Sequence, residues 1–283
     1  MKRKILDYTF LAALIFCSFI SVITLGSIFW FIFSQGASTL YLQFFTATTV
    51  DIFAMDKLRA MFISTLLVVI STLLIIGPFA MLAAIYLNEY ARKSKFAKLV
   101  RFLVDILASI PSIIYGLFGM AVFTQLLNFG MSIISGAMTL SLMLLPILMR
   151  QTELALSQVP HSYKEASIGL GATKFETIVN VILPNAFPSI SVGFLLVIGR
   201  IVGESAALIF TVGSFVRMPI NRATGVLSIF EAGTTLTIRA FIEVKEYGNV
   251  ELAAAIGVII LLTVLLLNLL SKFIIMLTGR KIK

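Results

Sequence analysis

Two opposite charges stand four residues apart inside an otherwise apolar stretch, at Arg200 and Glu204. In a continuous helix this spacing places both side chains on one face. A guanidinium group offers a planar fork of donors that matches phosphate or sulfate. A carboxylate beside it accepts a hydrogen bond from a phosphate that still carries a proton, whereas fully ionised sulfate has no proton to donate. The pair therefore suggests a site for a small oxyanion; the alternative is an internal ion pair that only fixes helix packing.

The surroundings of this pair are typical of a membrane span. The 283 residues are 59% hydrophobic, with a mean hydropathy of +1.06. A charge inside a bilayer costs about 2.5–3.5 kcal/mol on insertion scales, so both side chains should face protein or a water-filled path. Gly199 and Gly203 form a G-x-x-x-G pattern, which allows another helix to approach closely.

Apolar runs long enough to cross a hydrocarbon core of ~30 Å occur about six times in the chain. Backbone groups do not stay unpaired in lipid, so such runs must be helical, and they lack the alternating pattern of a membrane barrel. We therefore predict an all-α polytopic membrane protein with a single transmembrane domain over residues 1–283. The expected spans lie near residues 8–33, 60–87, 99–127, 131–149, 187–212 and 251–277.

Basic residues are distributed unevenly between the connections of these spans. They precede the first span, follow the second, occupy the connection over residues 150–186 and close the chain. By the positive-inside bias, both termini and the 150–186 connection face the cytoplasm. The net charge of +9 then reflects topology, and nucleic-acid binding is not expected. The residues on this side are Lys2, Arg3, Lys4, Arg92, Lys93, Lys95, Lys98, Arg101, Arg150, Lys164, Lys174, Lys272, Arg280, Lys281 and Lys283.

The connection over residues 150–186 holds two helix-start signals. Ser162 and Glu165 fit a capping box, in which each side chain satisfies a free backbone donor near the other, and Thr173 and Glu176 repeat the pattern. Gly171 between them can adopt the left-handed conformation that ends a helix. We predict a helix–turn–helix shaped to dock against a partner; the alternative is a surface hairpin without one.

This connection resembles the E-A-A-x3-G-x9-I-x-L-P loop of permease subunits of binding-protein-dependent ABC importers. Ser167 replaces the second Ala and Val181 replaces Ile. The resemblance implies a MetI-like, type I importer bundle whose coupling loop, residues 162–184, fits a cleft of an ATPase subunit. The matching residues are Glu165, Ala166, Gly171, Leu183 and Pro184.

Three other segments resemble the PstA-type permeases of phosphate-specific ABC importers. Residues 200–211 are similar to R-A-x-G-E-T-A-P-L-L-F-T, residues 110–119 to P-S-I-x-Y-G-L-F-G, and residues 86–90 to Y-L-x-E-Y. Ser205 stands where the family has Thr, and Ala207 where it has Pro.

The resemblance implies roles in transport for Arg200 and Glu204. Arg150, at the cytoplasmic end of the fourth span, also resembles a family arginine. A role for Arg150 in the exit path and a snorkelling charge at the membrane edge both remain open.

The same resemblance implies partners. A second, PstC-like permease would complete the path, two PstB-like ATPase subunits would supply energy, and a PstS-like binding protein would deliver phosphate in a bacterial or archaeal inner membrane. The sequence has no G-x-x-x-x-G-K-[ST] loop, so we expect no ATP binding of that type and no enzymatic activity of its own. No cofactor or metal is expected, since His161 is the single histidine.

Three other functions compete with this interpretation. An intramembrane protease needs a Ser activated by a His within the membrane, but His161 lies on the cytoplasmic loop. A secondary anion transporter, independent of ATP, usually shows internal repeats, and none is detected. A sulfate or molybdate permease would share the coupling loop, and the segment containing Arg200 and Glu204 favours phosphate over these.

Two smaller predictions concern the membrane edges. Asp105 is expected to pair with Arg101, four residues earlier in the third span. Residues 234–243, in the outer connection, are expected to form a short helix at the interface.

Overall fold

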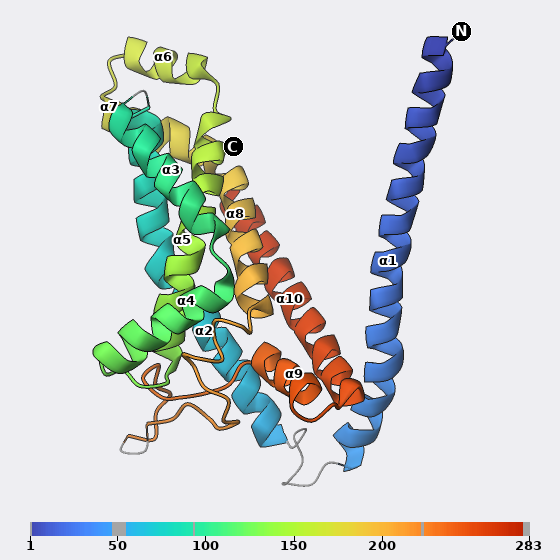
Figure 1. The fold of residues 1–283 in the computed structure, drawn as a ribbon. Helices are drawn as coiled ribbons and strands as arrows, with labels where there is room; N and C mark the ends of the chain where they lie inside the picture. The colour runs from blue at the N-terminus through green and yellow to red at the C-terminus, as the bar shows by residue number, and fades with distance from the viewer. Residues whose placement is uncertain (1, 47–54, 93, 222–223, 280–283) are drawn as a thin grey trace.

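The long apolar runs form helices throughout the described chain (Figure 1). The structure is a computed structural model that describes residues 2–46, 55–92, 94–221 and 224–279. The basic C-terminal residues Arg280, Lys281 and Lys283 lie outside the described residues, as do Lys93 and Arg222. In chain order the helices are α1 Lys2–Thr46, α2 Met55–Ile85, η1 Tyr86–Tyr90, α3 Lys95–Ser109, α4 Ser112–Gly119, η2 Met120–Leu126, α5 Ile133–Ser157, α6 His161–Gly169, α7 Lys174–Thr177, η3 Ile178–Ile182, α8 Leu183–Gly203, α9 Leu236–Lys245 and α10 Val250–Gly279.

Five helical segments of the described chain are long and apolar enough to cross a membrane, or six if one bent pair counts as a single span. The expected all-α membrane fold is therefore confirmed. The five are Thr9–Ala37, Lys57–Tyr90, Ile133–Ser157, Lys174–Gly203 and Val250–Phe273.

The bent pair lies where one span was expected over residues 99–127. Helix α3 ends at Ser109, and the following α4–η2 segment starts at Ser112 with a change of direction of 94°. Pro111 causes the break. Its ring restricts Ile110 to an extended conformation, and Ile110 has φ −71° and ψ 131°. The third span is thus divided in two.

The fifth span begins and ends earlier than the expected range 187–212. Helix continues from Lys174 through the wide turn of η3 into α8, and it stops at Gly203. Pro184 lies directly after η3, where the α-helical hydrogen-bond pattern is already interrupted, and the helix continues past it. Residues 204–212 form turns instead of the last part of a span.

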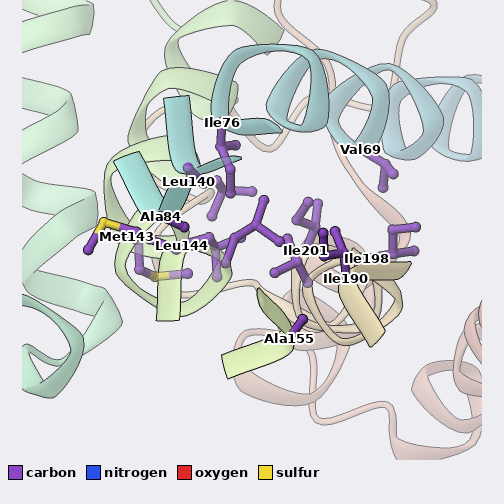
Figure 2. Close-up of a cluster of buried hydrophobic side chains, with 14 of the residues drawn as sticks. Val69, Ile76, Ala84, Leu140, Met143, Leu144, Ala155, Ile190, Ile198 and Ile201 are labelled. Carbon is purple, nitrogen blue, oxygen red and sulfur yellow. The ribbon is translucent and has the colours of Figure 1, made fainter. Parts of the chain in front are cut away.

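The core lies between α2, α5 and α8, where side chains from all three helices meet (Figure 2). Leu140 and Leu144 of α5 are fully buried, and Ile76 of α2 and Ile201 of α8 are almost so. Lipid is as apolar as these side chains, so close packing rather than escape from water holds the helices together. Gly193 of α8 illustrates this, since an added Cβ would lie 2.9 Å from a side-chain carbon of α5.

Helix α1 lies apart from this core and packs on α10 (Figure 1). Its described side chains are almost all exposed. The buried Gly36 allows the contact, because a Cβ there would meet the backbone oxygen of Ala254 at 2.6 Å. Figure 1 shows the N-terminus, α6 and the C-terminus toward the same end of the bundle.

On the opposite end, α9 follows the irregular segment after α8. Thr235 caps α9 by accepting a hydrogen bond from the backbone N–H of Ile238. The expected short helix over residues 234–243 is confirmed, with its start and end two residues later. Within α9, Arg239 forms an ion pair with the buried Glu243.

Candidate transport path and coupling loop

Arg200 lies in the last turn of α8 and is exposed in the single chain. Its guanidinium group makes no hydrogen bond or ion pair with another described residue. Beside it, Gly199 and Gly203 have nothing within 4 Å of the position that a Cβ would take. The face of α8 that carries Arg200 is therefore free for another subunit or for a water-filled path.

Glu204 does not share this helix face, so the expectation of an adjacent charged pair on one helix was wrong. Helix α8 ends at Gly203, and Glu204 is extended at φ −82° and ψ 128°. Its Oε1 accepts a hydrogen bond from the backbone N–H of Ala207 at 3.2 Å. The four-residue spacing aligns side chains only in an uninterrupted helix, and the helix stops between these two residues.

The turns after Glu204 are held against α4 and α5 by close contacts at two glycines and by a backbone hydrogen bond. A Cβ on Gly116 of α4 would lie 2.8 Å from the Cα of Ala207, and one on Gly136 of α5 would lie 2.2 Å from a methyl carbon of Val212. The backbone N–H of Ser132 donates to the carbonyl of Thr211 at 2.9 Å. The segments 110–119 and 200–211, singled out separately in the sequence, thus pack together.

The connection between α5 and α8 forms a helix, a turn and a second helix, as expected. The first helix, α6, starts at His161 after Pro160, and no side chain caps it. The capping box predicted for Ser162 and Glu165 is therefore wrong. Pro160, at ψ 137°, occupies the cap position, so Ser162 is already helical. Glu165 instead contacts the Nδ1 of His161 at 3.1 Å.

The turn and the start of the second helix follow the prediction. Gly171 has φ +91°, in the left-handed region, and its N–H donates to the carbonyl of Ile168 at 2.9 Å. The Thr173–Glu176 capping box is confirmed. Thr173 Oγ1 accepts from the Glu176 N–H at 3.3 Å, and Glu176 Oε2 accepts from the Thr173 N–H at 2.8 Å.

The coupling loop presents apolar side chains to solvent in the single chain. Ile168, Leu170 and Phe175 are 55%, 91% and 68% exposed. Large apolar side chains exposed on a polar loop are typical of a docking surface. The remaining predicted loop residues divide into two groups: Ser162, Glu165, Ala166, Gly171, Thr173 and Glu176 are exposed, and Leu183 and Pro184 are half-buried at the start of α8.

An ion pair that sequence reasoning missed ties this loop to η1, which continues α2. Lys164 Nζ lies 2.5 Å from Glu89 Oε1, and both side chains are largely buried, at 13% and 7% exposure. Asn88 donates to the same carboxylate at 2.7 Å, and Lys174 lies over the ring of Tyr90 at 4.3 Å. The one feature of the sequence that could have indicated this ion pair is the polar stretch 88–90 at the end of an apolar run.

Arg150 belongs to a second charged cluster at this end of the bundle. Its Nη1 lies 3.1 Å from Glu153 Oε2, and Arg101 Nε lies 2.6 Å from Glu153 Oε1. The predicted pairing of Arg101 with Asp105 is wrong, because Arg101 is directed to Glu153 and Asp105 is exposed without a partner among the described residues. Glu153 is buried and was not singled out in the sequence.

No group of three or more potential metal ligands is present among the described residues. The chemistry that the arrangement supports is the attraction of anions by Arg200 and by the arginines around Glu153, together with docking at the coupling loop.

Comparison with known proteins identifies relatives over most of the chain. Residues 76–283 match the family of binding-protein-dependent transport system inner membrane components. The chain is 33% identical to the probable ABC transporter permease protein YqgI of Bacillus subtilis over 284 residues, covering 97% of this chain and 96% of that relative. It is 37% identical over 198 residues to the phosphate transport system permease protein PstA of Haemophilus influenzae, covering 69% and 70% of the two chains.

A further relative is longer. The PstA homolog of Mycoplasma pneumoniae is 32% identical over 80% of this chain, but the match spans 34% of that protein. Solved structures show the same fold. The MetNI methionine ABC transporter superposes with a TM-score of 0.58 at 20% identity, covering 81% of this chain and 97% of the other. The bacterial alginate ABC transporter gives a TM-score of 0.62 at 18% identity, covering 92% and 95%.

Proposed function

Because the chain belongs to the family of binding-protein-dependent transport system inner membrane components, we propose that it forms half of the translocation path of an ATP-driven phosphate importer. It is a multi-pass membrane protein of the ABC importer permease fold. In this proposal both termini and the coupling loop face the cytoplasm, and ATP is hydrolysed by separate subunits rather than by this chain.

The exposed Arg200 carries the proposal. A charge in the membrane that faces lipid costs about 2.5–3.5 kcal/mol even on the mildest scales. Arg200 has no partner among the described residues, and the neighbouring Gly199 and Gly203 leave its helix face uncovered. The cost is avoided when a second, related permease covers that face and encloses water between the two subunits. Arg200 then lines the path between them.

The coupling loop supplies the connection to an ATPase. The apolar side chains of Leu170 and Phe175, exposed in the single chain, would be buried in a cleft of that subunit. The pair between Lys164 and Glu89 would carry a displacement of α6 to η1 and so to α2. Closure of two ATPase subunits on ATP would thereby change which side of the membrane the path opens to.

Phosphate is favoured as cargo by the groups near the end of α8. Arg200 supplies donors for an oxyanion. Glu204 uses Oε1 to accept from Ala207, and its other oxygen makes no hydrogen bond with a described residue. That oxygen is available to accept a hydrogen bond from the P–OH group of hydrogen phosphate, a donor that sulfate lacks. The similar PstA proteins are named as phosphate permeases, in agreement with this choice over sulfate or molybdate. A phosphate-delivering binding protein would dock near α9, at the end of the bundle away from the coupling loop.

The test is uptake of labelled phosphate by cells whose only high-affinity phosphate route contains this chain. Arg200→Gln is compared with Lys98→Gln, which removes an exposed charge from α3. We expect Arg200→Gln to abolish uptake while the permease still co-purifies with the ATPase, and Lys98→Gln to transport normally. Full uptake by Arg200→Gln would refute a role in the path. Transport of sulfate or molybdate but not phosphate would refute the cargo.

A further inference from the structure

A basic cavity opens at the end of the bundle that carries the coupling loop, away from Arg200. It has a volume of about 270 Å³ and lies between η1 with the connection that follows it, α3 and the end of α5. A water molecule takes about 30 Å³ in the liquid, so the cavity has room for a polyatomic ion with some of its hydration. Its lining residues are Asn88, Arg92, Arg101, Arg150, Glu153, Leu154 and Ser157.

The charges of this lining do not balance. Three arginines face one carboxylate, and both oxygens of Glu153 are already in use. Arg101 is also held by its Nη2, which donates to the carbonyl of Leu87 at 3.2 Å. Glu153 therefore holds Arg101 and Arg150 in place but neutralises only one of the three positive charges.

Donors remain available at two of the arginines. Arg150 uses Nη1 for Glu153, and its other guanidinium nitrogens make no hydrogen bond with a described residue. The side chain of Arg92 makes none at all within the described chain. Arginine guanidinium groups bind phosphoryl oxygens through pairs of parallel hydrogen bonds. Two such groups at one cavity offer more donors than one carboxylate ligand can accept from, and a tetrahedral oxyanion is the ligand that fits them better.

The adjoining helix places the cavity near the membrane surface. Helix α3 exposes Phe96, Leu99 and Phe102 together with Lys95 and Lys98. Apolar and basic side chains on one short helix are typical of the interface between hydrocarbon and headgroups. Basic pockets between membrane helices on the cytoplasmic side are suited to phosphate-bearing headgroups.

We propose that the cavity bounded by Arg92, Arg101 and Arg150 binds a phosphoryl oxyanion, with Glu153 holding two of the arginines in position. The phosphoryl group has two sources. One is the headgroup of an anionic phospholipid in the inner leaflet, which does not depend on the cargo. The other is inorganic phosphate on the cytoplasmic side, which rests on the proposed function because it would be the imported product.

The experiment uses the assembled importer in nanodiscs. All measurements are made in an Arg200→Gln background, so that binding near Arg200 does not contribute. In discs of phosphatidylcholine alone, equilibrium dialysis with labelled inorganic phosphate tests the free ion. In discs that contain phosphatidylglycerol, native mass spectrometry counts the anionic lipid retained. Arg92→Gln is compared with Lys272→Gln, which removes the same charge from an exposed residue of α10 outside the cavity lining.

We expect Arg92→Gln to weaken retention of at least one probe tenfold or more, and Lys272→Gln to change it less than twofold. Retention of the lipid identifies the headgroup as the source, and retention of phosphate identifies the free ion; either supports the site. Arg92 has no partner in the described chain, so assembly should be unaffected, which size-exclusion chromatography checks. Equal retention in Arg92→Gln and its parent, or retention of neither probe, would overturn the proposal. Phosphate uptake by the unmodified importer is scored separately, so failure here is distinct from failure of the proposed function.

Discussion

The ion pair between Lys164 and Glu89 should determine how firmly the coupling loop is held to the membrane helices. Removing one partner of a fully buried pair costs about 3–5 kcal/mol. Here the side chains are 13% and 7% exposed, and Asn88 still donates to Glu89, so we expect about 2 kcal/mol for Lys164→Met. Since 1.4 kcal/mol corresponds to tenfold, the loop should detach about 30 times more often.

Hydrogen–deuterium exchange of α6 measures this detachment directly in the permease in nanodiscs. We expect exchange of the α6 amides to rise about 30-fold in Lys164→Met, and phosphate uptake by the assembled importer to fall. Glu89→Gln should act in the same direction, and the double variant should cost less than the sum of the two, because the lost interaction is shared. Lys98→Gln is the charge-matched control. Unchanged exchange in both single variants, or strictly additive costs, would refute the reasoning.

Three other changes have expected outcomes. Gly116→Val should sharply reduce the yield of folded permease on size-exclusion chromatography, because a Cβ at this position would lie 2.8 Å from the Cα of Ala207. Gly26→Val is the control and should leave the yield unchanged, because a Cβ at position 26 would have nothing within 4 Å. Thr173→Ala should remove a cap worth about 1 kcal/mol and speed exchange at the start of α7 about fivefold; unchanged exchange there would contradict the role of the box. Leu170→Asp should leave the permease folded, since this side chain is 91% exposed, but should abolish co-purification of the ATPase; retained co-purification would place the docking surface elsewhere.

Local signals in the sequence predicted local structure, but only where no neighbour competed with them. Thr173 and Glu176 form the box that their spacing indicates, with Gly171 at φ +91° before them. Ser162 and Glu165 have the same spacing, yet Pro160 takes the cap position and starts α6 one residue before Ser162. A capping pattern therefore marks a helix start only when the residue just before it stays outside the helix.

Contacts between distant parts of the chain could not be predicted from local residue patterns. Arg101 had one visible candidate partner, Asp105, at helical spacing, but its ion pair is with Glu153, 52 residues away. The packing of α3 against α5 brings Glu153 into reach, and a buried carboxylate needs a partner more than an exposed Asp105 does. Gly116 is similar: its motif was visible, but its function as a contact for Ala207 required the fold.

Helix α8 ends between Arg200 and Glu204. This break bears on the two interpretations of Arg200, as part of a packing ion pair or as a residue of the transport path. If the two shared a helix face, Glu204 would neutralise Arg200 and weaken its attraction for an anion. In the structure Glu204 caps the next turn instead, and Arg200 keeps its full charge on an uncovered face. Placing an unpaired guanidinium in lipid near the end of a span is unfavourable in free energy. It is tolerated where an anion or water solvates the charge. The loss of the expected pair thus favours Arg200 as part of an anion path.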